Sequence, residues 1–77
     1  MNYDLAIMAL EGLARAPLTI RVEENAIAIE GPPASFKELA RLCLLIGGAQ
    51  TKDAFELQPN VHVTGDSLRL VIRAVGD

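Results

Sequence analysis

The chain has 77 residues, of which 51% are hydrophobic, and its formal net charge is −3. This length corresponds to one small domain, so we expect residues 1–77 to fold as a single unit around one apolar core. The charges are mixed in sign and form no long block, which argues against a nucleic-acid partner.

The single cysteine and the lengths of the apolar runs indicate the compartment. Cys43 has no second cysteine to pair with, which excludes an intramolecular disulfide framework and favours a reducing compartment. The N-terminus lacks the basic region of a signal peptide. No apolar run approaches the roughly 20 residues of a transmembrane helix. We therefore expect a soluble, cytoplasmic protein with no membrane partner.

Two amphipathic segments predict helices. Apolar residues recur with helical spacing over residues 3–16, and Pro17 ends this pattern. Ser35 and Glu38 form a capping box at the start of a second helix, which a pair of glycines at 47 and 48 is expected to end. The side of the second helix that faces the core is expected to hold Phe36, Leu39, Ala40, Cys43 and Ile46.

The first hairpin is expected directly after the first helix. Apolar and polar residues alternate over residues 18–23 and 26–30, which predicts two strands joined by a two-residue turn at 24 and 25. Such a turn pairs Val22 with Ile27 and Ile20 with Ile29. All the large apolar side chains then lie on one face, turned toward the helices.

A second hairpin is expected over residues 61–72, with its turn at 65 and 66. This register pairs Val63 with Leu68 and Val61 with Leu70, and it leaves His62 opposite Arg69 on the other face. Residues 49–60 form a long connection before it, in which Phe55 and Leu57 favour a short additional strand.

These elements predict an α+β domain with the order αββαββ. Two helices pack on one face of a four-stranded, mainly antiparallel sheet, because this arrangement buries the apolar stripes of both hairpins. The other face of the sheet is left open.

Neither a catalytic nor a metal site is expected. Cys43 is placed on the core side of its helix as a small apolar group, whereas His62, the only histidine, projects from the opposite side of the sheet. A metal site needs three or four donors, and no second histidine is present. The segment GGAQTK at 47–52 resembles a phosphate-binding loop only superficially, because its glycines end a helix and do not begin one. We therefore expect no cofactor.

The open sheet face carries most of the residues that suit a partner. Guanidinium groups beside small residues are typical of protein or acidic-ligand interfaces, although antiparallel sheets also commonly leave one face solvated. Leu45 adds apolar surface on the second helix, which either a partner or the 49–60 connection would cover. The candidate partner-binding residues are Arg21, Leu45, His62, Arg69, Val71 and Arg73.

The segments IEGPPASFKELARL and NVHVTGDSLRLVIR resemble small bacterial immunity proteins of polymorphic toxin systems. In that family, a strand that ends in a glycine turn leads to a leucine-rich helix and a histidine-containing hairpin. The resemblance covers residues 27–73 and leaves the first helix unmatched. It implies a non-enzymatic protein that binds and blocks a cognate toxin, with no catalytic residue.

The sequence thus predicts a non-catalytic protein-interaction module that also self-associates as a homo-oligomer. It is expected to engage a protein partner, such as a toxin, through the open sheet face or residues 49–60. The alternative is a small-ligand or acidic-metabolite binder, derived from a degenerate enzyme, that uses Arg21, Arg69 and His62.

Overall fold

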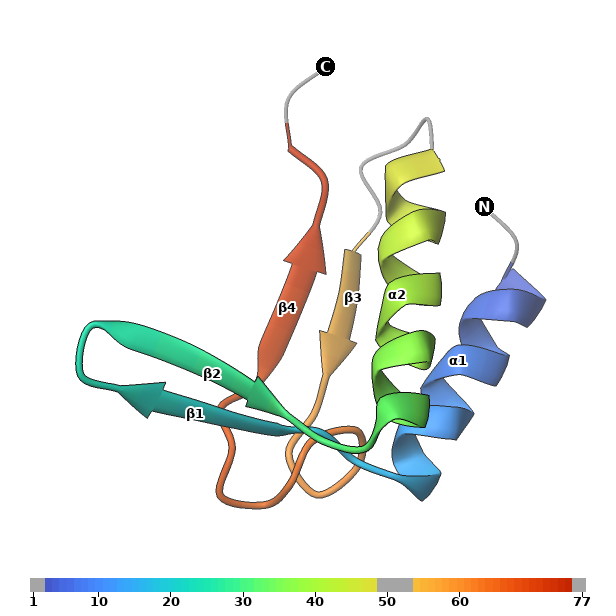
Figure 1. The fold of residues 1–77 in the computed structure, drawn as a ribbon. Coiled ribbons are helices and arrows are strands. Elements are labelled where there is room, and N and C mark those ends of the chain that lie inside the picture. Colours follow the sequence, from blue (N-terminus) through green and yellow to red (C-terminus); the bar gives the residue numbers. More distant parts are fainter. Residues whose placement is uncertain (1–2, 49–53, 76–77) are drawn as a thin grey trace.

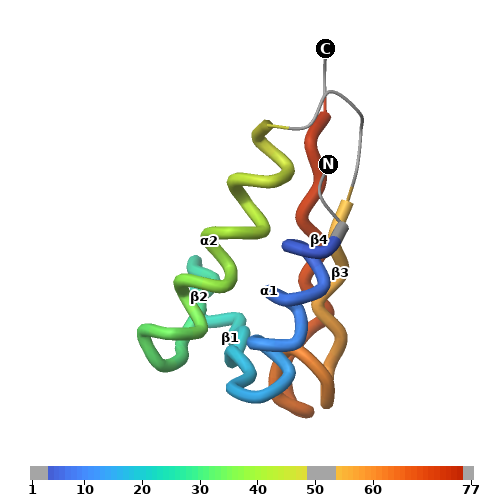
Figure 2. Tube along the Cα trace, turned by 90° about the vertical axis from the view of Figure 1, so that its right-hand side faces the viewer, coloured from blue at the N-terminus to red at the C-terminus, as the bar shows by residue number. Residues whose placement is uncertain are grey.

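The computed structural model describes residues 3–48 and 54–75, and it confirms an α+β fold. Two helices lie side by side next to one strand pair, while a second strand pair extends away from them (Figure 1). The elements are α1 (Tyr3–Arg15), β1 (Thr19–Glu23), β2 (Ala26–Glu30), α2 (Pro33–Gly48), β3 (Ala54–Leu57) and β4 (Leu70–Arg73). A perpendicular view places both helices on the same side of the β3–β4 pair (Figure 2).

The prediction of one four-stranded sheet is wrong. In the described residues, β1 pairs only with β2 and β3 pairs only with β4, both antiparallel. A single parallel bridge between Leu18 and Val63 connects the β1–β2 hairpin to the chain between β3 and β4. The expected open sheet face is therefore divided between two ribbons that point in different directions (Figure 1).

The β1–β2 hairpin has the predicted register. Val22 lies opposite Ile27 and Ile20 lies opposite Ile29, around a turn at residues 24 and 25. Asn25 adopts the left-handed conformation, with φ of 60°, which asparagine tolerates better than most residues. The local turn and the alternating pattern agree, which explains why the register could be predicted.

The second hairpin forms from other residues than predicted. β4 pairs with β3, so Phe55 lies opposite Ile72 and Leu57 opposite Leu70. This confirms the short strand at Phe55 and Leu57, whereas the predicted pairing of Val61 and Val63 with residues 68–70 is wrong. The backbone N–H groups of residues 61, 62 and 63 all donate to the carbonyl of Gln58, at 3.1, 3.0 and 3.2 Å. A tight turn thus replaces the expected strand.

The core lies between α1, α2 and the β3–β4 pair and extends to the base of the β1–β2 hairpin. Its buried apolar residues are Ala6, Ala9, Leu13, Leu18, Ile20, Leu42, Ile46, Phe55, Leu57 and Val63. Of the hairpin stripe that was expected to face the helices, only Leu18 and Ile20 are buried, at 0% and 5% exposure. Val22 and Ile27 are 66% and 71% exposed, because the outer part of the hairpin extends beyond the helices.

Helix α2 begins at Pro33, two residues before the predicted cap, so the capping box is wrong. The hydroxyl of Ser35 donates to the carbonyl of Ala16 at the end of α1, at 2.6 Å. This contact turns Ser35, Leu42 and Ile46 inward, and it leaves Phe36, Ala40 and Cys43 exposed. Cys43 is therefore not the buried apolar group that the pattern predicted. The helix continues through both glycines to Gly48, and residues 49–53 of the expected connection lie outside the described residues.

No helix in the described ranges is long and apolar enough to cross a membrane.

Two leucines on α2 provide a test of this inward face. Leu42 is completely buried, whereas Leu44 is 75% exposed. We expect Leu42→Ala to lower the free energy of unfolding by about 2–5 kcal/mol, because it leaves a cavity in the core. Leu44→Ala should change it by less than about 0.5 kcal/mol. Urea unfolding of both variants measures the difference, and equal losses would show that the helix face is misassigned.

Candidate functional site

In the part of the chain that the structure describes, the hydrogen bonds between the β1–β2 hairpin and the rest of the molecule lie near the base of the hairpin. The N–H group of Leu18 donates to the carbonyl of His62 at 3.1 Å, and the N–H group of Thr64 donates to the carbonyl of Leu18 at 2.8 Å. Two residues further along the chain, the N–H group of Ile20 donates to the Ser67 hydroxyl at 2.9 Å. The first residues of the hairpin are thus held against the segment between β3 and β4.

A chain of hydroxyl groups extends this attachment. The Ser67 and Thr64 hydroxyls lie 2.7 Å apart, and the Thr64 hydroxyl donates to the Asp66 carboxylate at 2.7 Å. Since an ionised carboxylate can only accept, the Thr64 proton is committed to Asp66 and Ser67 must donate to Thr64. The hydrogen bond from Thr64 is the main cause that lowers the pKa of Asp66. The Thr64 hydroxyl also lies 3.3 Å from the Thr19 hydroxyl of β1, so this network adds a side-chain contact to the hairpin base.

Beyond this base, the hairpin presents apolar side chains to solvent. Val22 and Ile27 form a cross-strand pair on the apolar face, and Leu68, at 59% exposure, lines a shallow groove together with Val22. The groove has a volume of about 320 Å³, and its other lining residues are Ile20, Arg21 and Asp66. We call the exposed residues Val22, Ile27 and Leu68 the hairpin patch.

Arg21 lies at the border of the hairpin patch. Its Nε donates to a carboxylate oxygen of Glu30 at 2.6 Å, and this hydrogen bond is the main cause that raises the pKa of Arg21. The charge of Asp66 raises it further. An apolar centre with a bordering guanidinium and carboxylate is the usual composition of a protein-binding surface.

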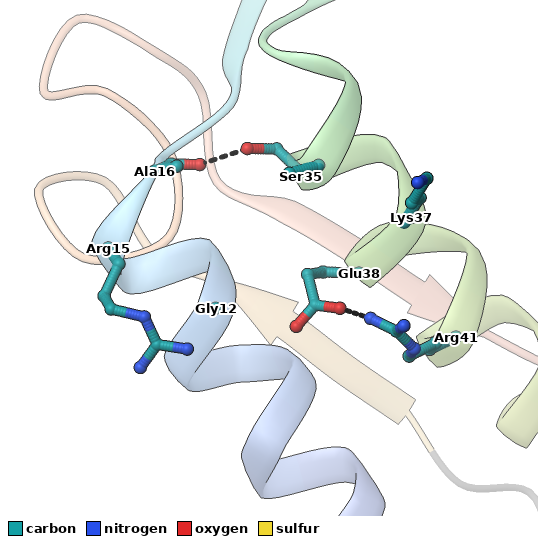
Figure 3. Close-up of a pocket in the computed structure, with 8 residues that line it drawn as sticks. Gly12, Arg15, Ala16, Ser35, Lys37, Glu38 and Arg41 are labelled. Carbon is teal, nitrogen blue, oxygen red and sulfur yellow. Dashed lines mark hydrogen bonds and ion pairs between the residues drawn. The ribbon is translucent and has the colours of Figure 1, made fainter.

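A second hollow lies between α1 and α2 (Figure 3), with a volume of about 360 Å³. The Ser35 hydroxyl bonds to the carbonyl of Ala16 at one end, and Glu38 is ion-paired with Arg41 at the other. Gly12 faces Glu38 across the hollow, and a Cβ atom there would lie 2.8 Å from Cδ of that side chain. Glycine at this position thus allows the carboxylate to enter between the helices.

The positively charged side chains that line the hollow between the helices do not converge on one point. Arg15 and Lys37 both line it, yet their charged groups point in different directions (Figure 3). The remaining cation, Arg41, is neutralised by Glu38. Since an anion site needs donors that converge, we interpret this hollow as the junction of the two helices.

The predicted partner-binding residues are distributed over several parts of the molecule. Arg21 alone borders the hairpin patch. Arg69 approaches Glu56 at 3.7 Å, while Val71 and Arg73 lie in β4, opposite Glu56 and Ala54. Leu45 packs partly against the core from α2 and lines an apolar notch with Leu5, Arg41 and Leu44. His62 lies in the turn after β3, half-buried, and not opposite Arg69.

The residues of the hairpin patch were assigned to the core from the sequence. An alternating apolar stripe has the same pattern whether a helix covers it or not, so the sequence carries no signal that separates the two cases. The role of Ser67 was also missed, because it depends on a contact with Ile20, which is 47 residues away in the chain. No group of three or more His, Cys, Asp or Glu side chains in the described ranges is arranged to hold a metal ion.

His62 gives the attachment of the hairpin a predictable pH dependence. Its Nδ1 accepts a hydrogen bond from the N–H group of Gln58 at 3.2 Å, and burial lowers its pKa below 6.5. The unfolded chain therefore binds this proton more readily than the folded chain does. The contribution of His62 to the free energy of unfolding is therefore fully present above pH 6.5 and is lost as the pH decreases toward the lower pKa of the folded state.

We expect His62→Asn to remove this dependence, because its amide oxygen can replace Nδ1 as the acceptor but does not titrate. Urea unfolding of both proteins on either side of pH 6.5 measures it. Parallel stability curves for the two proteins would contradict the assignment.

Comparisons of this chain with protein-family models, with curated proteins and with solved structures find no match. The resemblance to immunity proteins therefore stays a prediction from the sequence. The function is inferred below from the geometry of the described residues.

Proposed function

We propose that this chain is a non-catalytic protein-interaction module and that the hairpin patch is its partner-binding surface. The observation that carries the proposal is the exposure of Val22, Ile27 and Leu68, which are 66%, 71% and 59% accessible. Val22 lies beside both of the others, across the strand pair and along the groove. Contiguous apolar side chains with a polar border are characteristic of protein-binding sites.

The energetics support a protein as the occupant. Covering apolar surface is favourable by about 25 cal/mol per Å², and a protein partner covers an open, shallow surface more completely than a small molecule does. The groove beside Val22 is shallow and open, and its charged residues, Arg21 and Asp66, already have partners in Glu30 and Thr64. The hairpin patch thus offers an apolar area to a protein partner, and it offers a metabolite few polar groups that are not already bonded.

The alternative, a small-ligand or acidic-metabolite binder, receives less support. Its three proposed residues contact different partners: Arg21 contacts Glu30, Arg69 approaches Glu56, and His62 accepts from Gln58. The structure thus does not direct these side chains at one another. A protein-binding function requires no such convergence.

Two narrower features belong to the proposal. The class of partner is a toxin, following the resemblance of residues 27–73 to bacterial immunity proteins, and the chain acts in the cytoplasm, where its single cysteine stays reduced. The chain also self-associates as a homodimer, because a domain of 77 residues gains stability when a second copy covers its apolar surface.

The proposal is tested in two steps. A photo-reactive amino acid at Val22 is used to cross-link the bound protein in cells, and mass spectrometry identifies that protein. The affinity of the purified partner is then measured by calorimetry for the wild type, Val22→Asp and Leu68→Asp. We expect each variant to bind at least about tenfold more weakly, because it places a charge at the centre of the contact.

Leu44→Asp serves as the matched control. Leu44 is also exposed, at 75%, but it lies on α2 and not in the hairpin patch. Its affinity for the partner should equal that of the wild type, and circular dichroism should show that all variants are folded. Equal weakening by all three substitutions, or none by Val22→Asp, would exclude the hairpin patch as the binding surface.

A further inference from the structure

We infer that two copies of this chain pair through the outer edges of their β2 strands, antiparallel about a twofold axis at Ala28. The inference rests on the self-association included in the proposed function, and it identifies the surface that forms the dimer. The observations that support it are the direction of the backbone groups, the unprotected edge and the symmetry of the strand.

The hydrogen-bonding pattern directs the backbone of Ile27 and Ile29 outward. In an antiparallel pair, residues alternate between those that bond across to the neighbouring strand and those that do not. The Ile20 N–H group bonds outward to Ser67, so Ile20 and its opposite residue Ile29 form a pair that does not bond across. Ile27 is two residues from Ile29 and has the same orientation. The N–H and C=O groups of both isoleucines therefore point away from β1.

Nothing in the described residues covers this edge. β2 pairs only with β1. Natural edge strands are often protected by a charged side chain, a proline or a bulge. β2 has no proline and an uninterrupted register, and its one charged residue, Glu30, lies at its end and is bonded to Arg21. Its side chains are also accessible, with Ile27 at 71% and Ile29 at 38% exposure. Such an edge pairs readily with another strand.

The symmetry of β2 identifies that strand as a second copy. A twofold interface requires one surface to be complementary to itself. The segment Ile27, Ala28, Ile29 reads the same in both directions, so an axis at Ala28 places Ile27 opposite Ile29 of the second copy. These are the residues whose backbone groups point outward, and each such pair exchanges both backbone hydrogen bonds. Alanine, which is small, lies at the axis, where the strands approach most closely.

The charges are compatible with this arrangement. Glu30 comes to lie opposite Ala26 of the second copy and not opposite another carboxylate, and it is already bonded to Arg21 of its own chain at 2.6 Å. On the apolar face, Ile27 and Ile29 of one copy adjoin those of the other. The two hairpins thus form a continuous four-stranded ribbon whose apolar face contains two hairpin patches.

Sedimentation velocity and disulfide trapping test the inference together. The full chain with Cys43→Ser is used, because Cys43 is exposed and would react. We expect the sedimentation coefficient to rise from the monomer to the dimer value over about a hundredfold range of concentration. Ala28→Cys in this background should form a covalent dimer on oxidation, because the two Cα atoms at the axis lie about 4.5 Å apart, within disulfide range.

Ala26→Cys is the matched control on the same strand. The two Ala26 residues would lie roughly 13 Å apart, so no disulfide should form between them. A monomer at all concentrations, or equal cross-linking at both positions, would overturn the inference. If the chain is a monomer but still binds a protein through Val22, the dimer is excluded and the proposed partner surface is not. If the dimer is trapped at Ala28 but binds no protein, the proposed partner surface is excluded and the dimer is not.

Discussion

The backbone hydrogen bonds of Leu18 determine how the rest of this molecule is arranged. Leu18 is completely buried, and both of its backbone groups bond to the segment between β3 and β4, through His62 and Thr64. In the described residues, two further contacts extend along β1, one between the hydroxyls of Thr19 and Thr64 and one from the Ile20 N–H group to Ser67. Because the attachment ends there, the outer part of the hairpin has no support from the helices. Its apolar face and the outer edge of β2 therefore remain available for another protein.

The two ends of the chain use their apolar residues differently. α1, α2, β3 and β4 enclose nearly all of the core, and the contact between Ser35 and Ala16 joins the helices where α1 ends and α2 begins. The hairpin contributes Leu18 and Ile20 to this core but leaves its tip uncovered. A small domain has little stability to spare, so apolar residues that do not serve its own core are best explained by an interface. The proposed partner binding and the proposed β2 pairing involve different parts of the β1–β2 hairpin, namely a face and an edge.

Local patterns in the sequence predicted the elements that local interactions determine. The extent of α1 and the register around Asn25 are confirmed, because each follows from neighbouring residues. The errors arose where a contact absent from the local pattern determines the structure. Ser35 looked like a helix cap, but it bonds to Ala16, and this rotates α2 so that Cys43 is exposed. Residues 61–63 alternate like a strand, yet their amides bond to Gln58. Only the tertiary structure shows that the stripe containing Val22 has no cover.

The hairpin patch exists only because the tip of the β1–β2 hairpin is separated from the helices. Nuclear Overhauser effects between methyl groups, recorded at low protein concentration, measure this separation. We expect contacts between Val22 and Ile27, and contacts of Ile20 with the core, but none from Val22 or Ile27 to the methyl groups of α1 or α2. Clear contacts from these two residues to Leu39, Leu42 or Ile46 would mean that the hairpin folds over the helices. In that case no exposed hairpin patch would exist.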